Sequence, residues 1–240
     1  MGRIGILGGT FNPPHLGHLA LARHAHEALG LDRVFLMPSR EPPHKREAPD
    51  PGPRHRLAMC RLLVDGDPAL SACNLETRRA GPSYTVETLR ELHSTHPEQA
   101  LTFIAGSDAV ATLASWREPG ALLELADVAI AARPGADANE ALQAVAAVRS
   151  SPRDASGPLS RDVRVLEIEP LDVSSSVARE RAARGEPIEA LVGQAVADYI
   201  AEHGLYGAGA GASGDAGEGR GASAGDGGGT RAAEGGGAGG

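Results

Sequence analysis

The chain has 240 residues, of which 41% are hydrophobic, and this is enough for one globular domain with a core. Its formal net charge of −8 argues against broad binding to a nucleic-acid backbone, which needs a basic face. No apolar run approaches the roughly 18 residues of a membrane span, and the first residues lack the layout of a signal peptide. We therefore expect a globular cytoplasmic protein with neither a nucleic-acid nor a membrane partner.

Strands and helices are expected to alternate along the first 206 residues. Short apolar runs predict strands at Arg3–Gly8, Arg33–Met37, Leu70–Leu75, Leu101–Ala105, Val128–Ala131 and Val163–Ile168. Apolar residues at helical spacing predict helices at Gly17–Leu29, Arg54–Val64, Thr85–His93, near Ser107, and at Asn139–Val148, Ser175–Arg184 and Ile188–His203. Six prolines predict a loop over Pro38–Pro53. The alternation predicts an α/β, Rossmann-like, doubly wound fold, with a mostly parallel sheet covered by helices on both faces.

A change of composition near Tyr206 marks the expected end of this domain. From Gly207 to Gly240, 16 of 34 residues are glycine, and the segment contains no Val, Leu, Ile, Met or aromatic residue. Without apolar side chains to bury, nothing offsets the entropy lost on ordering such a segment. We expect one domain over residues 1–206 and a disordered Gly-rich tail over residues 207–240.

The turn after the first strand is the first place to look for a site, because doubly wound sheets bind ligands outside the carboxyl ends of their strands. There, Gly8 and Gly9 would let backbone amides approach a phosphate closely, and the following helix offers free N–H groups and its positive end. His15 and His18 share one face of the first helical turn and suit a negatively charged transition state. Half of a metal site is an alternative, but no Cys, Asp or Glu neighbour completes it. The segment matches neither the Walker loop nor the dinucleotide fingerprint.

Two motifs give the chain a resemblance to a known superfamily. The segment GGTFNPPHLGH resembles the first signature of the nucleotidylyltransferases, whose T/H-x-G-H element binds ATP phosphates; here His15–His18 fills it. Ser174–Arg179 (SSSVAR) resembles the second signature, S-S-T-x-x-R, with Ser176 keeping the hydroxyl of the usual Thr. From the residues alone, three hydroxyls before a helix predict an N-cap. Arg179, one turn further, makes the same cap a second anion site.

Within that superfamily, residues 3–206 are most similar to the nicotinate-nucleotide adenylyltransferase family. Further elements of that family follow in order: Pro42–Lys45 (PPHK), Gly81–Thr85 (GPSYT), Gly106–Asp108 (GSD), Trp116, Arg133–Gly135 (RPG) and His203–Tyr206 (HGLY). Two positions depart from the pattern. Asn12 stands where Asp is commoner, and Arg117 stands where an aromatic residue often follows the Trp. Neither departure is expected to touch the phosphate machinery, but Arg117 could alter contacts at the pyridine carboxylate.

The resemblance implies a reaction that joins nicotinate mononucleotide to the AMP part of ATP and releases pyrophosphate, with both nucleotides as partners. It implies catalytic roles for His15, His18 and Arg179. It implies ATP binding by Gly8, Gly9, Thr10, Phe11, His18, Gly106, Asp108, Ser175, Ser176 and Arg179. It implies mononucleotide binding by His44, Lys45, Tyr84, Thr85, Trp116 and Arg133. Mg²⁺ is expected to enter with ATP and to take few direct protein ligands, so no metal-ligating residue is assigned.

Several alternatives remain at the level of sequence. The acceptor could be another phosphorylated compound, nicotinamide mononucleotide or phosphopantetheine, on the same fold. A non-catalytic nucleotide-binding regulator is a second reading, although His18 and Arg179 are both intact. A fragment of a class I synthetase would need an anticodon-binding region for which 206 residues leave no room. The sequence also leaves open a homo-oligomer and the closing of the Pro38–Pro53 loop over substrate.

Overall fold

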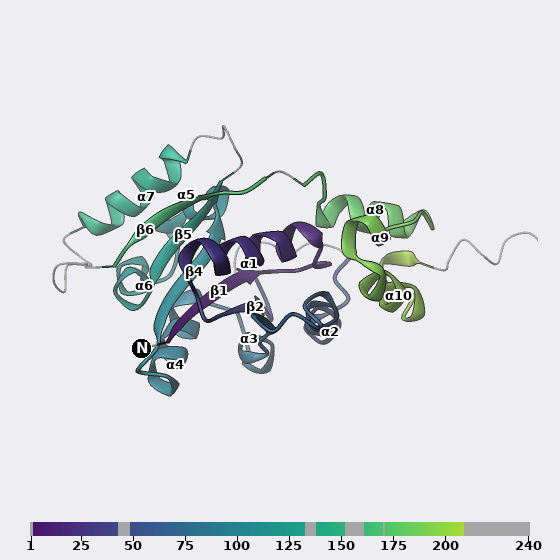
Figure 1. The fold of residues 1–240 in the computed structure, drawn as a ribbon, viewed down its shortest axis with the longest axis horizontal. Coiled ribbons are helices and arrows are strands. Elements are labelled where there is room, and N and C mark those ends of the chain that lie inside the picture. Colours follow the sequence, from purple (N-terminus) through teal and green to yellow (C-terminus); the bar gives the residue numbers. More distant parts are fainter. Residues whose placement is uncertain (1, 43–48, 133–137, 152–160, 170, 209–240) are drawn as a thin grey trace, which may run out of the picture.

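The structure is a computed structural model that describes residues 2–42, 49–132, 138–151, 161–169 and 171–208. A six-stranded sheet forms its centre, with the strand order β3-β2-β1-β4-β5-β6 (Figure 1). All five neighbouring pairs are parallel. The strands are β1 (Arg3–Gly9), β2 (Arg33–Pro38), β3 (Leu70–Ala72), β4 (Ala100–Gly106), β5 (Asp127–Ala132) and β6 (Val163–Glu167). The predicted doubly wound α/β fold is confirmed.

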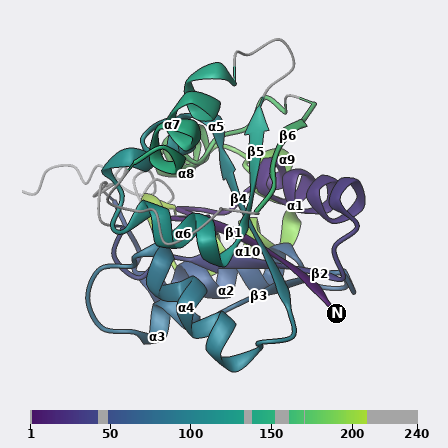
Figure 2. The same cartoon turned by 90° about the vertical axis from the view of Figure 1, so that its left-hand side faces the viewer.

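Helices cover both faces of the sheet, each over its own apolar core. One face carries α1 (Leu16–Leu29), α2 (Pro53–Leu63), α8 (Ser175–Ala183), α9 (Glu189–Val192) and α10 (Gln194–Glu202). The other carries α3 (Leu75–Arg78), α4 (Thr85–Thr95), α5 (Ser107–Ala111), α6 (Pro119–Leu125) and α7 (Asn139–Arg149). Two 3-10 turns complete the described elements, η1 (Leu113–Ser115) and η2 (Leu205–Gly207). Figure 2 shows α1 and α6 on opposite sides of the strands.

Strand β1 lies at the centre of this arrangement because its side chains alternate between the two cores. Leu7 packs with the helices of the first face, whereas Ile4 and Ile6 pack with those of the second. Gly5 lies between them, and a Cβ there would come within 2.7 Å of the Leu31 side chain. The strand order reverses between β1 and β4, so the carboxyl ends of these two strands form the crevice where such sheets bind ligands.

The structure corrects two of the predicted elements. The strand predicted at Leu70–Leu75 ends at Ala72, because Leu75 already begins α3. The single helix predicted at Ile188–His203 is broken at Gly193, whose backbone has φ 84° and ψ 153°. That positive φ is costly for a residue with a Cβ, so the break falls on the glycine. The short helices α3 and α6 were not predicted.

The predicted tail falls mostly outside the described residues. Gly207 belongs to η2 and Ala208 packs against the first core, so the first two residues beyond the expected boundary still contact the domain. Residues 209–240 lie outside the described part of the chain, and the tail therefore stays a prediction. No described helix is both long enough and apolar enough to span a membrane.

Candidate active site

The loop from β1 to α1 brings the first motif to the carboxyl edge of the sheet. Gly8 and Gly9 end β1, and a Cβ on either would come within 3.2 Å of an aromatic ring, from Phe103 or Phe11. Phe11 itself adopts a positive φ of 53°, while its ring is buried with 2% exposure. The chain then enters α1 with His15 as its N-cap residue. The loop thus brings the N-terminus of α1 to the carboxyl edge of the sheet.

The two histidines of the first motif stack against each other at the start of α1. Their ring centroids are 3.7 Å apart, and the centroid of the Phe11 ring lies 4.8 Å from that of His18. The backbone N–H of His15 donates to Nδ1 of His18 at 3.2 Å. Nδ1 of His18 is therefore the acceptor, and the proton of the neutral ring belongs on Nε2.

Burial keeps both imidazoles neutral at pH 7. It lowers the pKa of His15 to about 4, and it lowers the pKa of His18 well below its ordinary value, with repulsion from His15 when both rings are protonated acting in the same direction. A neutral imidazole with its proton on Nε2 still donates one hydrogen bond. His18 can therefore act as a donor to a phosphate oxygen without carrying a positive charge of its own.

The second motif is hydrogen-bonded directly to the first. Ser174 caps α8 by accepting from the backbone N–H of Val177 at 3.2 Å, so the N-cap predicted from the three hydroxyls is confirmed. The Ser175 hydroxyl donates to the Pro13 carbonyl at 2.8 Å. The Arg179 guanidinium donates to the Asn12 carbonyl at 2.6 Å and to the Ser176 hydroxyl at 3.3 Å. These bonds place a second helix N-terminus and an arginine beside the loop that precedes α1.

Asn12 is more deeply involved in this loop than its sequence suggested. It is 1% exposed, and its side-chain amide donates to the Pro49 carbonyl at 3.1 Å. Its Oδ1 accepts the Tyr206 hydroxyl at 2.7 Å. Its backbone carbonyl also accepts the Arg179 guanidinium, a bond that does not depend on which side chain stands here, so the expectation that Asn in place of Asp leaves the phosphate machinery untouched stays a prediction.

A fully buried arginine, Arg56 on α2, joins the same loop to the next one, and sequence reasoning missed it. Its guanidinium donates to the carbonyls of Thr10 and Ser39, both at 2.7 Å, and to that of Arg40 at 2.9 Å. Its Nε pairs with Asp50 at 3.0 Å. The side chain is 0% exposed, so its charge depends on such buried partners rather than on water. Arg56 therefore fixes the turn after β1 against the turn after β2.

A cavity of about 260 Å³ opens beside this loop on the face that carries α4. Tyr84 and Thr85, at the start of α4, line it together with Trp116, so the structure brings these three predicted residues together. The Trp116 ring meets Phe103 edge-on at 5.8 Å, and its indole N–H donates to the Thr112 hydroxyl at 3.0 Å. The lining residues are Ile6, Gly8, Gly9, Thr10, Ser39, Pro42, Glu76, Ser83, Tyr84, Thr85, Val86, Thr88, Leu89, Phe103, Ala105, Ala109, Trp116 and Arg117.

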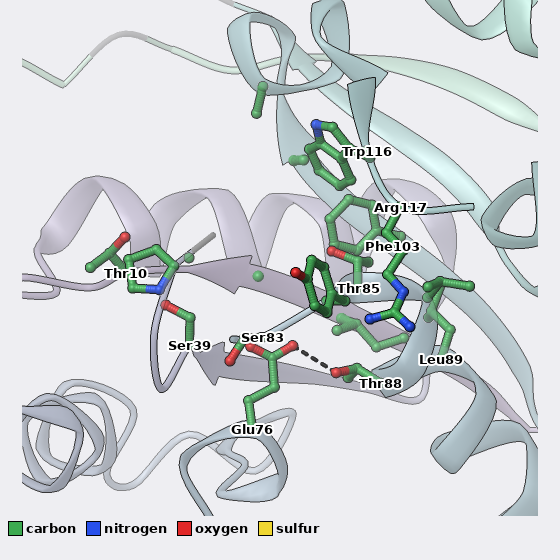
Figure 3. Close-up of a pocket in the computed structure, with 18 residues that line it drawn as sticks. Thr10, Ser39, Glu76, Ser83, Thr85, Thr88, Leu89, Phe103, Trp116 and Arg117 are labelled. Atoms are coloured by element: carbon green, nitrogen blue, oxygen red, sulfur yellow. Dashed lines mark hydrogen bonds between the residues drawn. The ribbon is translucent and has the colours of Figure 1, made fainter. Parts of the chain in front are cut away.

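Two charged side chains of this lining, Glu76 and Arg117, were not among the predicted site residues. Glu76 is buried and accepts the Thr88 hydroxyl at 2.8 Å, and burial raises the pKa of its carboxyl. Arg117 lies with its guanidinium carbon 4.7 Å from the centre of the Tyr84 ring. Figure 3 shows Trp116 at one end of the cavity, the bonded Glu76 and Thr88 at the other, and the Arg117 guanidinium to one side between them.

A second hollow of about 180 Å³ lies at the other end of the loop, against the histidine pair. Gly17 is essential to its shape, because a Cβ there would lie 3.0 Å from both Nδ1 of His15 and Cγ2 of Val173. The hollow is lined by His15, Gly17, His18, Ala20, Leu21, Ile168, Glu169, Leu171 and Val173. The loop from β1 to α1 thus lies between two cavities, one at Gly8–Thr10 and one at His15–His18.

The other predicted residues divide into two groups. Gly106 and Asp108 lie at the carboxyl end of β4 and the start of α5, both exposed, and a Cβ on Gly106 would meet nothing within 4 Å. His44, Lys45 and Arg133 lie outside the described residues. Within the described ranges, no group of three or more His, Cys, Asp or Glu side chains could hold a metal ion.

Known proteins share both the fold of this chain and the segment that contains its two motifs. Residues 6–181 match the family described as cytidylyltransferase-like. The fold resembles the nicotinic acid mononucleotide adenylyltransferase of Plasmodium falciparum complexed with NaAD, with a TM-score of 0.67 and 20% identity over 88% of this chain and 100% of that one. The chain is thus an enzyme of the cytidylyltransferase-like, nucleotidyltransferase class.

Proteins of similar sequence show to which family within this class the chain belongs. A Symbiobacterium thermophilum protein named "Probable nicotinate-nucleotide adenylyltransferase" is 43% identical over 206 residues, covering 86% of this chain and 96% of the relative. A Chromobacterium violaceum protein of the same name is 40% identical over 212 residues, covering 85% and 98%. The chain belongs to the nicotinate-nucleotide adenylyltransferase family.

Proposed function

We propose that this protein transfers the adenylyl group of ATP to nicotinate mononucleotide, giving deamido-NAD and pyrophosphate in NAD biosynthesis. One observation carries the proposal. The loop that presents the α1 N-terminus lies between a cavity lined by Tyr84 and Trp116 and a hollow bounded by the histidine pair. Such a layout suits two nucleotides that meet at their phosphates. The pyridine nucleotide would occupy the first cavity, stacked on Trp116, and the adenosine part of ATP would occupy the second.

The reaction needs little covalent help from the protein. A phosphate oxygen of the mononucleotide attacks the α-phosphorus of ATP in line and forms a new P–O bond. The bond from the α-phosphorus to the bridging oxygen breaks, and pyrophosphate leaves with the electron pair. Because the attacking phosphate is largely dianionic at pH 7, it needs no general base. Positioning and electrostatic stabilisation supply most of the rate.

Residues of the two motifs take the phosphates in this proposal. Nε2 of His18 donates to the α-phosphate, where negative charge builds up, with His15 packed against it. Arg179 and the N-terminus of α8, with Ser175 and Ser176, hold the leaving phosphates. This is consistent with the bonds of Ser175 and Arg179 to the Pro13 and Asn12 carbonyls and with the bond from Arg179 to Ser176. His44, Lys45 and Arg133 complete the mononucleotide side. Losing one such donor typically costs about 2.7–4 kcal/mol of transition-state stabilisation.

Magnesium belongs to the substrate in this proposal. It arrives on the phosphate oxygens of ATP and keeps most of its waters, as Mg²⁺ usually does. Asp108 and the exposed Gly106 backbone take the nucleotide sugar at the carboxyl end of β4. The catalytic unit is residues 1–206, with Gly207 and Ala208 in contact with it and the rest of the Gly-rich segment as a tail, and the reaction takes place in the cytoplasm without nucleic acid or membrane.

A panel of acceptors tests the proposal. The full chain is incubated with ATP, Mg²⁺ and nicotinate mononucleotide, nicotinamide mononucleotide or phosphopantetheine, and pyrophosphate release is measured with mass analysis of the product. We expect one deamido-NAD per pyrophosphate and a strong preference for nicotinate mononucleotide. Preference for phosphopantetheine would move the function to another acceptor. Tight ATP binding without turnover on any acceptor would make the protein a nucleotide-binding regulator.

A further inference from the structure

The charges around the Trp116 cavity are placed unevenly. Among the described residues that line it, Glu76 is the acid and Arg117 is the base. The Glu76 carboxyl is buried and engaged by the Thr88 hydroxyl at 2.8 Å. The Arg117 side chain is 51% exposed and lies at the mouth, over the Tyr84 ring. A ligand in the cavity thus meets a buried carboxyl at one position and a guanidinium at another (Figure 3).

Arg117 is held in place by contacts that leave part of its guanidinium available. Its Nη1 is 3.0 Å from the Glu87 carboxylate, and its Nε is 3.8 Å from that of Glu118. A guanidinium carries five N–H donors in a planar fork, so these two pairs do not exhaust it. The guanidinium carbon also lies over the Tyr84 ring, 4.7 Å from its centre, which is a cation–π contact. Arg117 is therefore a cation held near the cavity with donors to spare.

A carboxylate and an amide on the same ring would respond differently to these two groups. A carboxylate accepts two parallel bonds from a guanidinium, with full charge assistance, whereas a neutral amide offers only its carbonyl oxygen. Near Glu76 the amide is preferred to the carboxylate, because a second carboxylate there would be repelled whereas an amide NH₂ could donate to Glu76. The cavity therefore favours an acidic ring substituent directed toward Arg117 and away from Glu76.

We infer that Arg117 is a specificity-determining residue that selects the acid over the amide form of the pyridine mononucleotide. The inference rests on the proposed function for the identity of the ligand, and on the cavity geometry for the residue. Solvent around the exposed side chain and the nearby Glu87 carboxylate both weaken the attraction of Arg117 for a ligand carboxylate. Its contribution to the acid preference is therefore moderate. We expect Arg117 to account for about a ten-fold preference for the acid.

Substitutions expected to lower the preference for the acid, and one expected to raise it, test this role. Arg117→Gln should lower kcat/KM for nicotinate mononucleotide about ten-fold, mainly through KM, and leave the amide within about two-fold. Arg117→Lys keeps the charge but not the fork and should fall between. Glu87→Gln removes a carboxylate that competes for Arg117, so it should raise the preference for the acid. Arg90→Gln is the matched control, because Arg90 also pairs with Glu118, at 2.5 Å, but does not line the cavity.

Measuring the affinity for each mononucleotide tests the role of Arg117 independently of the proposed reaction. Calorimetric affinities of wild type and Arg117→Gln for the two mononucleotides should show the same loss of acid preference, whether or not turnover occurs. Absent turnover in the wild type, with this binding preference intact, would defeat only the proposed function. Equal losses for acid and amide in Arg117→Gln, no loss for either, or no binding of the acid by wild type would each overturn the role of Arg117.

Discussion

Replacing Arg56 with Met should destabilise the protein more than any exposed charge substitution. Methionine fills much of the same space, but the carbonyls of Thr10, Ser39 and Arg40 then lose their donor, and Asp50 loses its counter-charge. Breaking a buried pair by removing one partner typically costs about 3–5 kcal/mol. Domains of this size are stable by only about 5–15 kcal/mol, so Arg56→Met should lose a large fraction of the free energy of unfolding.

Urea unfolding followed by circular dichroism measures this loss. Arg23→Met is the matched control, because Arg23 forms a similar single ion pair with Asp67 at 2.8 Å, but its side chain is 56% exposed. Such a surface pair is worth about 1 kcal/mol or less. Arg56→Lys, which keeps the charge and fewer of the bonds, should fall between the two. A loss below about 1 kcal/mol in Arg56→Met would show that this guanidinium does not hold the two loops together.

Three further predictions concern the same loop. First, because the pKa of His15 is lowered to about 4, the unfolded chain binds protons that the native state does not as the pH falls from 6.5 toward 4. The free energy of unfolding of wild type should therefore fall relative to that of His15→Gln across that window, by up to about 1.36 kcal/mol per pH unit. The same pH dependence for both proteins, measured by urea unfolding, would contradict this. Second, Gly17→Ala places a Cβ 3.0 Å from Nδ1 of His15, so kcat/KM for ATP should fall about ten-fold or more with little change in melting temperature; unchanged kinetics would contradict the assignment. Third, Tyr206→Phe removes a buried bond to Asn12 at 2.7 Å and leaves its Oδ1 without that donor, so the free energy of unfolding should drop by about 1–3 kcal/mol; no drop would mean that water replaces the hydroxyl.

The local parts of the site could be predicted from the sequence. A short apolar run, two glycines and a helix start predict the loop from β1 to α1, and these features involve neighbours in the chain. The alternation of strands and helices likewise predicted the sheet and its two helical layers. Gly193 offered a usable signal for the break between α9 and α10, because a glycine inside an apolar helical pattern often marks a boundary.

The long-range parts could not be predicted in the same way. Arg56 reads as an ordinary helix residue, and its four partners are up to 46 positions away in the chain. The Asn12 side chain accepts the Tyr206 hydroxyl and its backbone carbonyl accepts Arg179, from residues 194 and 167 positions away, and no local pattern indicates either contact. A side chain's role in such a network depends on which loops the fold brings together. The roles of the predicted site residues in binding and catalysis stay predictions.

The most direct test of the account is the activity of His18→Asn. An Asn side chain can still accept the His15 backbone N–H, which now bonds to Nδ1 at 3.2 Å, but it lacks the Nε2 donor. We expect kcat/KM for pyrophosphate release to fall about 10²–10³-fold, while the urea midpoint changes little. His24→Asn, an exposed residue on the same helix, should keep wild-type activity. A folded His18→Asn variant within about ten-fold of wild type would contradict the claim that the first turn of α1 stabilises the transition state.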